Sequence, residues 1–143
     1  MNQTSSPIPD SEILLYTSPD GQVQLDVRLQ EDTLWMTRQM MAKLFQTTVQ
    51  NIIMHVGNIY KEAELQREGP CKDFLQVRQE GSRNVRRPVN FYTLDMILSV
   101  GYRVNTRRGT QFRIWATQRL REYLVRGYAV HKKRLQQQQE ATA

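Results

Sequence analysis

Two amphipathic segments separated by only three polar residues constrain the fold of this 143-residue chain more than any other feature. Apolar side chains recur at helical spacing from Thr37 to Phe45 and again from Val49 to about Glu62, and Thr37 is a good N-cap. This pattern is typical of a helix-turn-helix, although any αα-hairpin has the same spacing. The side chains expected to face the core are Met40, Met41, Leu44, Phe45, Val49, Ile52, Ile53, Val56, Ile59 and Tyr60.

A basic hairpin is expected directly after these helices. Lys72–Val77 and Val85–Tyr92 have the composition of strands, and the polar residues Gln79–Asn84, with a glycine, form the turn between them. Pro88 indicates that the second strand lies at an edge, because proline has no N–H for a second neighbour. A hairpin in this place is typical of a winged helix-turn-helix.

The N-terminal part predicts a separate β-hairpin. Residues 1–11 are interpreted as a flexible leader, and Glu12–Thr17 is joined to Gln22–Leu29 by the turn signal Ser18–Gly21. Thr33–Met36 is a candidate third strand. The side chains that alternate toward one face are Val23, Leu25, Val27 and Leu29. Because this region is acidic, we assign its sheet to packing or oligomerisation rather than to nucleic-acid binding.

The C-terminal part predicts two further helices. Thr93 caps a short helix, residues 102–105 form a connection, and Thr106 or Thr110 caps a long helix that Gly127 ends. The expected inner face of the short helix is Leu94, Ile97, Leu98 and Gly101. The expected apolar stripe of the long helix is Phe112, Trp115, Ala116, Leu120, Tyr123 and Leu124.

The predicted fold class is therefore α+β. Residues 12–130 are expected to form a single winged helix-turn-helix-like domain with an N-terminal β-hairpin and a long C-terminal amphipathic helix. Residues 131–143 are a polar, Gln-rich tail, interpreted as a frayed helix end or a disordered segment.

Positive charge is concentrated in the second half of the chain. The net charge is +6, but residues 1–35 carry −5, residues 36–77 carry +1, and residues 78–134 carry fourteen bases and three acids, or +11. Fifteen of the twenty bases are arginine, which suits bidentate phosphate contacts. This distribution favours an anionic polymer as partner.

Several function classes lack their residues. No Gly-rich phosphate loop, GxSxG or HExxH motif occurs, Cys71 has no activating partner, and His55 has no partner carboxylate, so we expect no enzyme. Because the chain has only one cysteine and two histidines, we expect no structural metal site and no cofactor. Without an apolar run of about 18 residues or a signal peptide, we expect no membrane span and a cytoplasmic location.

The second helix of the motif offers polar side chains for reading bases. In a helix-turn-helix, the N-terminal part of this helix enters the major groove. Amides can pair bidentately with adenine, and threonine methyls can contact thymine. The candidate base readers are Thr47, Thr48, Gln50, Asn51 and His55.

Basic residues on three elements are candidates for the DNA backbone. Some precede the turn of the motif, some lie on the hairpin, where they could also enter a minor groove, and some begin the long helix. These candidates are Arg38, Lys43, Arg83, Arg86, Arg87, Arg107 and Arg108.

Three segments resemble the RhuM family of bacterial proteins, which are called virulence proteins by association. They are LWMTRQMMAKLFQTTVQNIIMHVGNIYKEAEL, CKDFLQV and FYTLDMILSVGYRVNTRRGTQFRIWATQRLREYLVRGY, within about residues 12–130. The resemblance implies a bacterial protein from horizontally acquired islands with an N-terminal winged-helix-like domain, and it implies no established activity. The turn departs from the family pattern because Gln46 stands where a glycine is usual. A further C-terminal domain, including a Fic-type transferase motif, is also absent from these residues.

The resulting hypothesis is a sequence-preferring double-stranded DNA-binding protein, a homodimer that regulates transcription or a mobile element. The alternative is a protein-interaction or adaptor domain that oligomerises through the long C-terminal helix and binds an acidic protein partner. An adaptor has no reason to prefer one DNA sequence, so sequence preference separates the two hypotheses.

Overall fold

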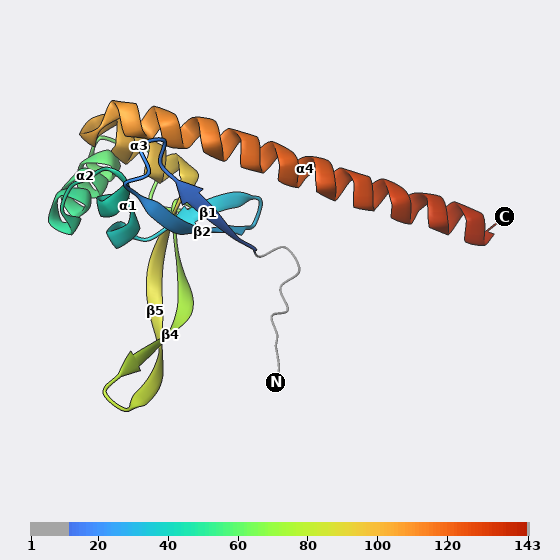
Figure 1. The fold of residues 1–143 in the computed structure, drawn as a ribbon, viewed down its shortest axis with the longest axis horizontal. Helices are drawn as coiled ribbons and strands as arrows, with labels where there is room; N and C mark the ends of the chain where they lie inside the picture. Colours follow the sequence, from blue (N-terminus) through green and yellow to red (C-terminus); the bar gives the residue numbers. More distant parts are fainter. Residues whose placement is uncertain (1–11, 143) are drawn as a thin grey trace.

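The protein is a mixed α+β structure with an antiparallel sheet and a long C-terminal helix (Figure 1). The computed structural model describes residues 12–142, with the backbone alone for 75–78, 128–132 and 138–142, so the expected leader 1–11 lies outside the described residues. The elements are β1 (Glu12–Thr17), β2 (Gln24–Gln30), β3 (Thr33–Met36), α1 (Arg38–Leu44), α2 (Val49–Lys61), β4 (Cys71–Glu80), β5 (Arg83–Thr93), α3 (Leu94–Val104) and α4 (Thr106–Thr142).

One five-stranded sheet joins the two hairpins in the order β1-β2-β3-β5-β4. The alternation expected in β2 is confirmed, because Val23, Leu25, Val27 and Leu29 are all buried. The candidate strand β3 is also confirmed, and it connects the hairpins by pairing Trp35 with Thr93 and Met36 with Tyr92. The sheet therefore links segments far apart in the sequence through two residue pairs.

The β4–β5 hairpin projects from the body as an arm (Figure 1). The predicted turn Gln79–Asn84 is too long, because the strands pair as far as Glu80 and Arg83 and leave only Gly81 and Ser82 between them. Gly81 has φ +63°, as a tight two-residue hairpin requires at its first central position. The prediction that this strand lies at an edge is wrong, because β5 pairs with both β3 and β4 and the edge strand is β4. Pro88 is tolerated because β3 pairs with β5 only at Tyr92 and Thr93, so Pro88 has a neighbour on one side only.

The core lies between one face of the sheet and the helices. Tyr16 from β1 packs edge-on against Phe112 and Trp115 from α4, with ring centroids 5.1 and 5.0 Å away. On the opposite face of the sheet, the Arg28 guanidinium stacks over Phe74 and Phe91 at 4.6 and 5.1 Å. Leu124, expected on the buried stripe of α4, is instead 60% exposed. The stripe is wrong there because Tyr123 still packs against the core, and Leu124 lies about 100° around the helix from it.

Helices α3 and α4 cross at two glycines. A Cβ on Gly101 would lie 3.1 Å from the Gly109 Cα and 2.8 Å from the Phe45 ring at the end of α1. The Phe45 side chain is fully buried. The missing Cβ atoms therefore allow three helices to meet at one point.

The junction between α3 and α4 differs from the prediction. The expected connection 102–105 is wrong, since α3 continues to Val104 and only Asn105 separates the helices. Asn105 also acts as the N-terminal cap of α4, because its Oδ1 accepts from the Arg108 N–H at 3.3 Å. The expected caps Thr106 and Thr110 are therefore wrong, and both lie inside the helix.

Helix α4 also runs beyond its predicted end. Gly127 does not end it, and the helix continues to Thr142, so residues 131–142 of the expected tail are helical. A glycine inside a helix costs only about 1 kcal/mol, and no proline follows it here. The 37 residues of α4 span about 55 Å at 1.5 Å per residue.

Substituting the buried Gly101 and the exposed Gly127 should have opposite effects on stability. Gly101→Ala should lower the free energy of unfolding by about 1–3 kcal/mol, since its Cβ overlaps the Phe45 ring. Gly127→Ala should raise it by about 0.5–1 kcal/mol, because its Cβ meets nothing within 4 Å and alanine favours a helix. Urea unfolding followed by circular dichroism measures both changes. Equal changes for the two variants would show that the crossing is not tightly packed.

Candidate nucleic-acid interface

The turn between α1 and α2 is built from backbone hydrogen bonds. Gln46 donates to the Lys43 carbonyl at 3.3 Å and Thr47 to the Ala42 carbonyl at 2.9 Å, which is the Schellman pattern of a helix end. Gln46 has φ +56°, the left-handed conformation that glycine adopts at lowest cost. The turn thus keeps a glycine-type geometry with a glutamine, whose Nε2 donates to Gln22 Oε1 at 2.9 Å.

Both helices of the pair begin at side-chain caps. The predicted cap Thr37 is confirmed, because its Oγ1 accepts from the Met40 N–H at 3.1 Å. Thr48 caps α2 in the same way, with its Oγ1 3.1 Å from the Asn51 nitrogen. These caps fix where each helix starts and therefore which side chains α2 presents.

Helix α2 buries one face and leaves the opposite face free. Ile52, Val56 and Ile59 are buried as expected. Ile53 is not, because it lies about 100° around the helix from Ile52 and is half-exposed. The exposed side chains and backbone of the outer face belong to Gln50, Ile53, Met54 and Gly57.

Three of the five candidate base readers are hydrogen-bonded within the turn, and the other two, Gln50 and His55, are not part of it. Thr47, Thr48 and Asn51 are tied to the turn, since Thr48 caps the helix and the Asn51 Nδ2 donates to Thr47 Oγ1 at 2.7 Å. Gln50 is exposed, whereas His55 is partly buried. Of the expected readers, Gln50 is thus the one presented to solvent without a role in the turn. Hydrogen bonding within the turn could not be inferred from residue types alone.

Arg108 is a correction to the candidate backbone contacts. Its side chain is only 8% exposed, and its Nη2 lies 2.9 Å from Asp20 Oδ2 while its Nη1 donates to the Leu44 carbonyl at 3.4 Å. The guanidinium therefore connects the β1–β2 turn, the end of α1 and the start of α4. It is withdrawn into the body because it faces a carboxylate and a helix-end carbonyl, so it is less accessible to a phosphate than the exposed Arg107 beside it.

Two other candidate cations flank the turn. Lys43 and Gln46 border one hollow with Gln22, and Arg107 borders a second, larger hollow that also contains Gln22 and Gln46. Both cations are exposed. The fold therefore places two exposed cations, from α1 and α4, beside the turn that precedes α2.

The arm carries the remaining candidates. Arg87 is paired in a bidentate manner with Glu80, at 3.0 and 2.9 Å, whereas Arg83 and Arg86 are exposed and have no ion-pair partner in the described part of the chain. Arg38 lies at the base of the arm, where it borders a hollow with Pro88 and Asn90.

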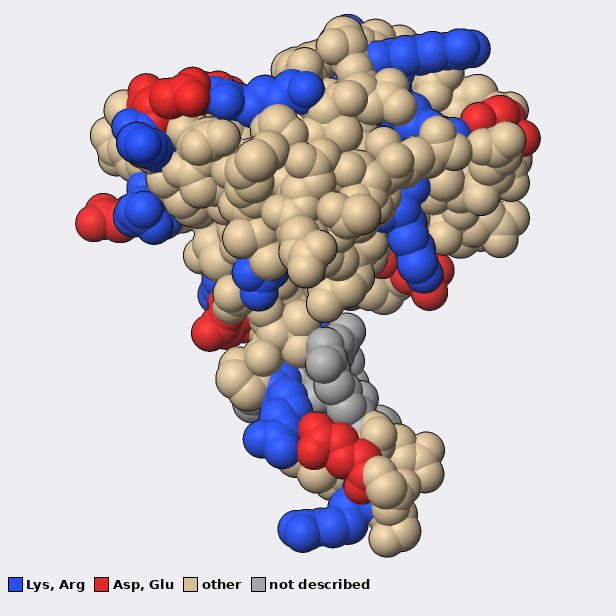
Figure 2. All heavy atoms as spheres, turned by 90° about the vertical axis from the view of Figure 1, so that its left-hand side faces the viewer, with Lys and Arg blue, Asp and Glu red and all other residues tan. Residues whose placement is uncertain are grey.

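Positive charge lies around the helix-pair face more than at its centre. Figure 2 shows this face largely uncharged in the middle, with Lys and Arg at its edges and along the arm. Some of these cations are neutralised within the molecule. Arg103 bonds Glu62 and Glu64 at 2.9 and 2.7 Å, which raises the pKa of its guanidinium further. The net charge of +11 on residues 78–134 therefore overstates the positive charge that a ligand can reach.

Reactive groups are sparse in the described residues. Burial raises the pKa of the Cys71 thiol above its usual value, so the group is not poised as a thiolate nucleophile at neutral pH. No cluster of three or more His, Cys, Asp or Glu side chains with metal-binding geometry occurs among the residues with described positions. None of the helices within residues 12–142 combines the length and apolarity that crossing a membrane requires.

The Arg108–Asp20 pair should make stability depend on pH. The Ser18 hydroxyl, the Gln22 N–H and Arg108 lower the pKa of Asp20. Since this pKa is lower in the folded state, the stabilisation is present above the unfolded carboxyl pKa and is lost as pH falls through the folded one. Asp20→Asn should lower the melting temperature at pH 7 and weaken its decline in acid. Asp26→Asn, at an exposed carboxyl on β2, is the control. Identical acid profiles for both variants would contradict this role of Asp20.

Comparison with known proteins places the chain in a family but not in a function. Residues 69–143 match the Virulence protein RhuM family, a segment that contains the arm, α3 and α4 but not α1 or α2. No curated protein and no solved structure matches the chain. Because the matched segment covers more than half of the sequence, the chain belongs to the virulence protein RhuM family.

Proposed function

We propose that this protein binds double-stranded DNA with sequence preference, using α1, α2 and the β4–β5 arm as a winged helix-turn-helix. In this arrangement α2 enters the major groove and the arm lies along the adjacent backbone or minor groove. Its role is that of a bacterial regulator of transcription or of a mobile element.

The observation that carries the proposal is that the helix pair and the arm are both connected to the same sheet, through β3 and β5. β3 leads directly into α1 and pairs with β5, and β5 pairs with β4 to form the arm. The order β3-β5-β4 agrees with the three-stranded sheet that a winged helix-turn-helix requires, which supports the proposal. This connection supports simultaneous contact of both parts with one duplex.

The available cations agree with such a contact. Lys43 and Arg107 lie beside the turn that precedes α2, and Arg83 and Arg86 lie near the end of the arm. Phosphate contacts from these two places would orient α2, while its uncharged outer face would meet base edges. The half-exposed Ile53 and Met54 suit thymine methyl groups on that face.

The same two apolar side chains favour a second candidate function. An exposed Ile53 and Met54 beside basic residues also suit an acidic protein with apolar anchors. That adaptor role predicts equal affinity for all duplex sequences. Selection of bound sequences from a random duplex library therefore distinguishes it from the proposed function.

Salt dependence tests the backbone contacts. If Lys43, Arg83, Arg86 and Arg107 each neutralise one phosphate, the log–log slope of affinity against salt should be about −3 to −4. Arg83→Ala with Arg86→Ala should reduce that slope by about two on every duplex. The matched control, Arg113→Ala with Arg134→Ala, removes two exposed cations from α4 and should leave the slope unchanged. Fluorescence anisotropy titrations measure these slopes, and equal reductions by both pairs would indicate non-specific attraction.

Base readout is tested by a matched pair of glutamines. Gln50→Ala should lower affinity for a selected duplex by about 1–3 kcal/mol and leave binding to scrambled DNA unchanged, because a neutral amide contributes only where it matches a base edge. Gln118, exposed on α4, should tolerate the same change. If Gln50→Ala weakens binding to both duplexes equally or to neither, α2 does not read bases in the proposed way.

A further inference from the structure

Strand β1 is an outer edge of the sheet. It is first in the order β1-β2-β3-β5-β4 and pairs with β2 along its whole length, from Glu12 to Thr17. Its other edge faces away from β2. An edge of this kind presents backbone N–H and C=O groups that another strand can use.

The two edges of the sheet differ in how they are protected. β4, at the opposite edge, carries exposed Lys72 and Asp73 and ends at Glu80. β1 carries one charge, Glu12, whose carboxylate is paired with Arg126 at 3.1 Å. Charged side chains discourage strand pairing at an edge, so β1 is the less protected of the two.

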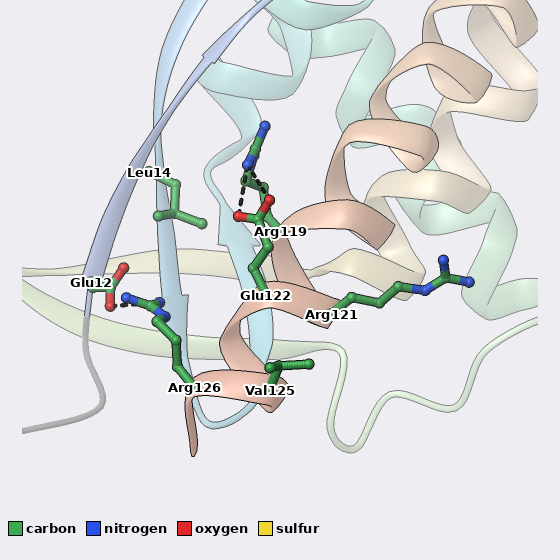
Figure 3. Close-up of a pocket in the computed structure, with 7 residues that line it drawn as sticks. All are labelled: Glu12, Leu14, Arg119, Arg121, Glu122, Val125 and Arg126. Atoms are coloured by element: carbon green, nitrogen blue, oxygen red, sulfur yellow. Dashed lines mark hydrogen bonds and ion pairs between the residues drawn. The ribbon is translucent and has the colours of Figure 1, made fainter. Parts of the chain in front are cut away.

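Both faces of β1 leave apolar surface uncovered. Ile13 and Leu15 lie on the face away from the helices and are 58% and 61% exposed. On the other face, Leu14 points into a groove of about 660 Å³ between β1 and α4, which Val125 also lines (Figure 3). Two large, exposed aliphatic side chains on a six-residue strand are unusual for an edge that stays free.

Four of the five charged residues around this groove are paired with one another. Arg126 pairs with Glu12, and Arg119 pairs with Glu122 at 2.8 Å, as the dashed lines of Figure 3 show. Arg121 extends away from β1 in the same view. An acidic protein or DNA therefore finds little free positive charge at this edge. A neutral, aliphatic strand fits it better.

We propose that the partner is the β1 strand of a second copy, paired antiparallel about a two-fold axis. Pairing Leu14 with its own copy places Ile13 opposite Leu15 of the other chain, and Leu15 opposite Ile13. All directly opposed pairs then lie on matching faces, as an antiparallel sheet requires. The strand is complementary to itself, and the five-stranded sheet becomes a continuous ten-stranded one.

The contact is small, so its affinity is modest. A stable interface usually buries about 800 Å² on each partner. A six-residue strand and a short groove provide less than this area. We expect a dissociation constant on the order of micromolar. This interface is independent of the proposed DNA-binding function, because neither α2 nor the arm takes part in it.

Sedimentation velocity of the full chain without DNA tests the interface over a series of concentrations. The wild type should shift from 16.9 kDa to twice that mass as concentration rises. Leu15→Lys should remain a monomer, since it opposes a charge to Ile13 of the second copy. Ile53→Lys, the same change at an exposed isoleucine on α2, should dimerise normally.

Every outcome bears on the proposal. A wild type that stays monomeric overturns it, as does a dimer that Leu15→Lys preserves or that Ile53→Lys alone disrupts. Circular dichroism checks that each variant is folded. If Leu15→Lys does not fold, Ile13→Lys on the same exposed face must give the monomer instead. Loss of DNA binding in a separate titration, with dimerisation intact, would count only against the proposed function.

Discussion

The contact between Gly101 and Gly109 positions most of the remaining structure. Because neither residue has a Cβ, α3 and α4 approach closely enough for the Phe45 ring to seat on Gly101. This contact joins the end of α1 to the C-terminal helices. It also sets the path of α4 across the sheet, where Phe112 and Trp115 meet Tyr16. The packing of the helix pair thus depends on a point where side chains are absent.

The unusual segment GYRVNTRRGTQFRIWA has a structural explanation at most of its positions. Gly101 and Gly109 form the crossing, Asn105 caps α4, and Arg108 holds the β1–β2 turn and the end of α1. Phe112 and Ala116 are buried in the core. Among its basic residues, Arg107 remains exposed beside the turn of the helix pair. This segment therefore supports the candidate interface more than it forms it.

Some basic residues are paired with carboxylates within the fold, whereas others are left exposed to a ligand. Arg87, Arg103 and Arg126 are each paired with carboxylates, and Arg108 is buried against Asp20. Among the candidate DNA contacts, the exposed and unpaired cations lie beside the helix-pair turn and on the arm, away from β1. This separation leaves a neutral edge for a second copy and basic surfaces for an anionic partner. The two proposals thus use opposite properties of one molecule and do not compete for the same surface.

Local patterns in the sequence were sufficient for most of the elements. The alternation from Val23 to Leu29 and the cap at Thr37 depend on residues near one another, so periodicity and capping chemistry predict them. The same chemistry applies to Thr48, which was expected to be a base reader and instead caps α2. Residue type was misleading for Pro88, because β5 is an inner strand whose pairing with β3 stops before the proline. The length of α4 was underestimated, because Gly127 resembles a helix end when the neighbouring helix formers are given less weight.

Only the tertiary structure decided which polar residues remain available. Arg108 and Arg107 are neighbours of the same type, yet one is buried against Asp20 and the other is exposed. Gln50 and Asn51 are likewise adjacent amides, but Asn51 is bonded to Thr47. These differences arise from segments folded against one another and from the direction in which each helix turns its faces. Sequence therefore determined the elements and the total charge, and packing determined which of those charges and amides a partner can reach.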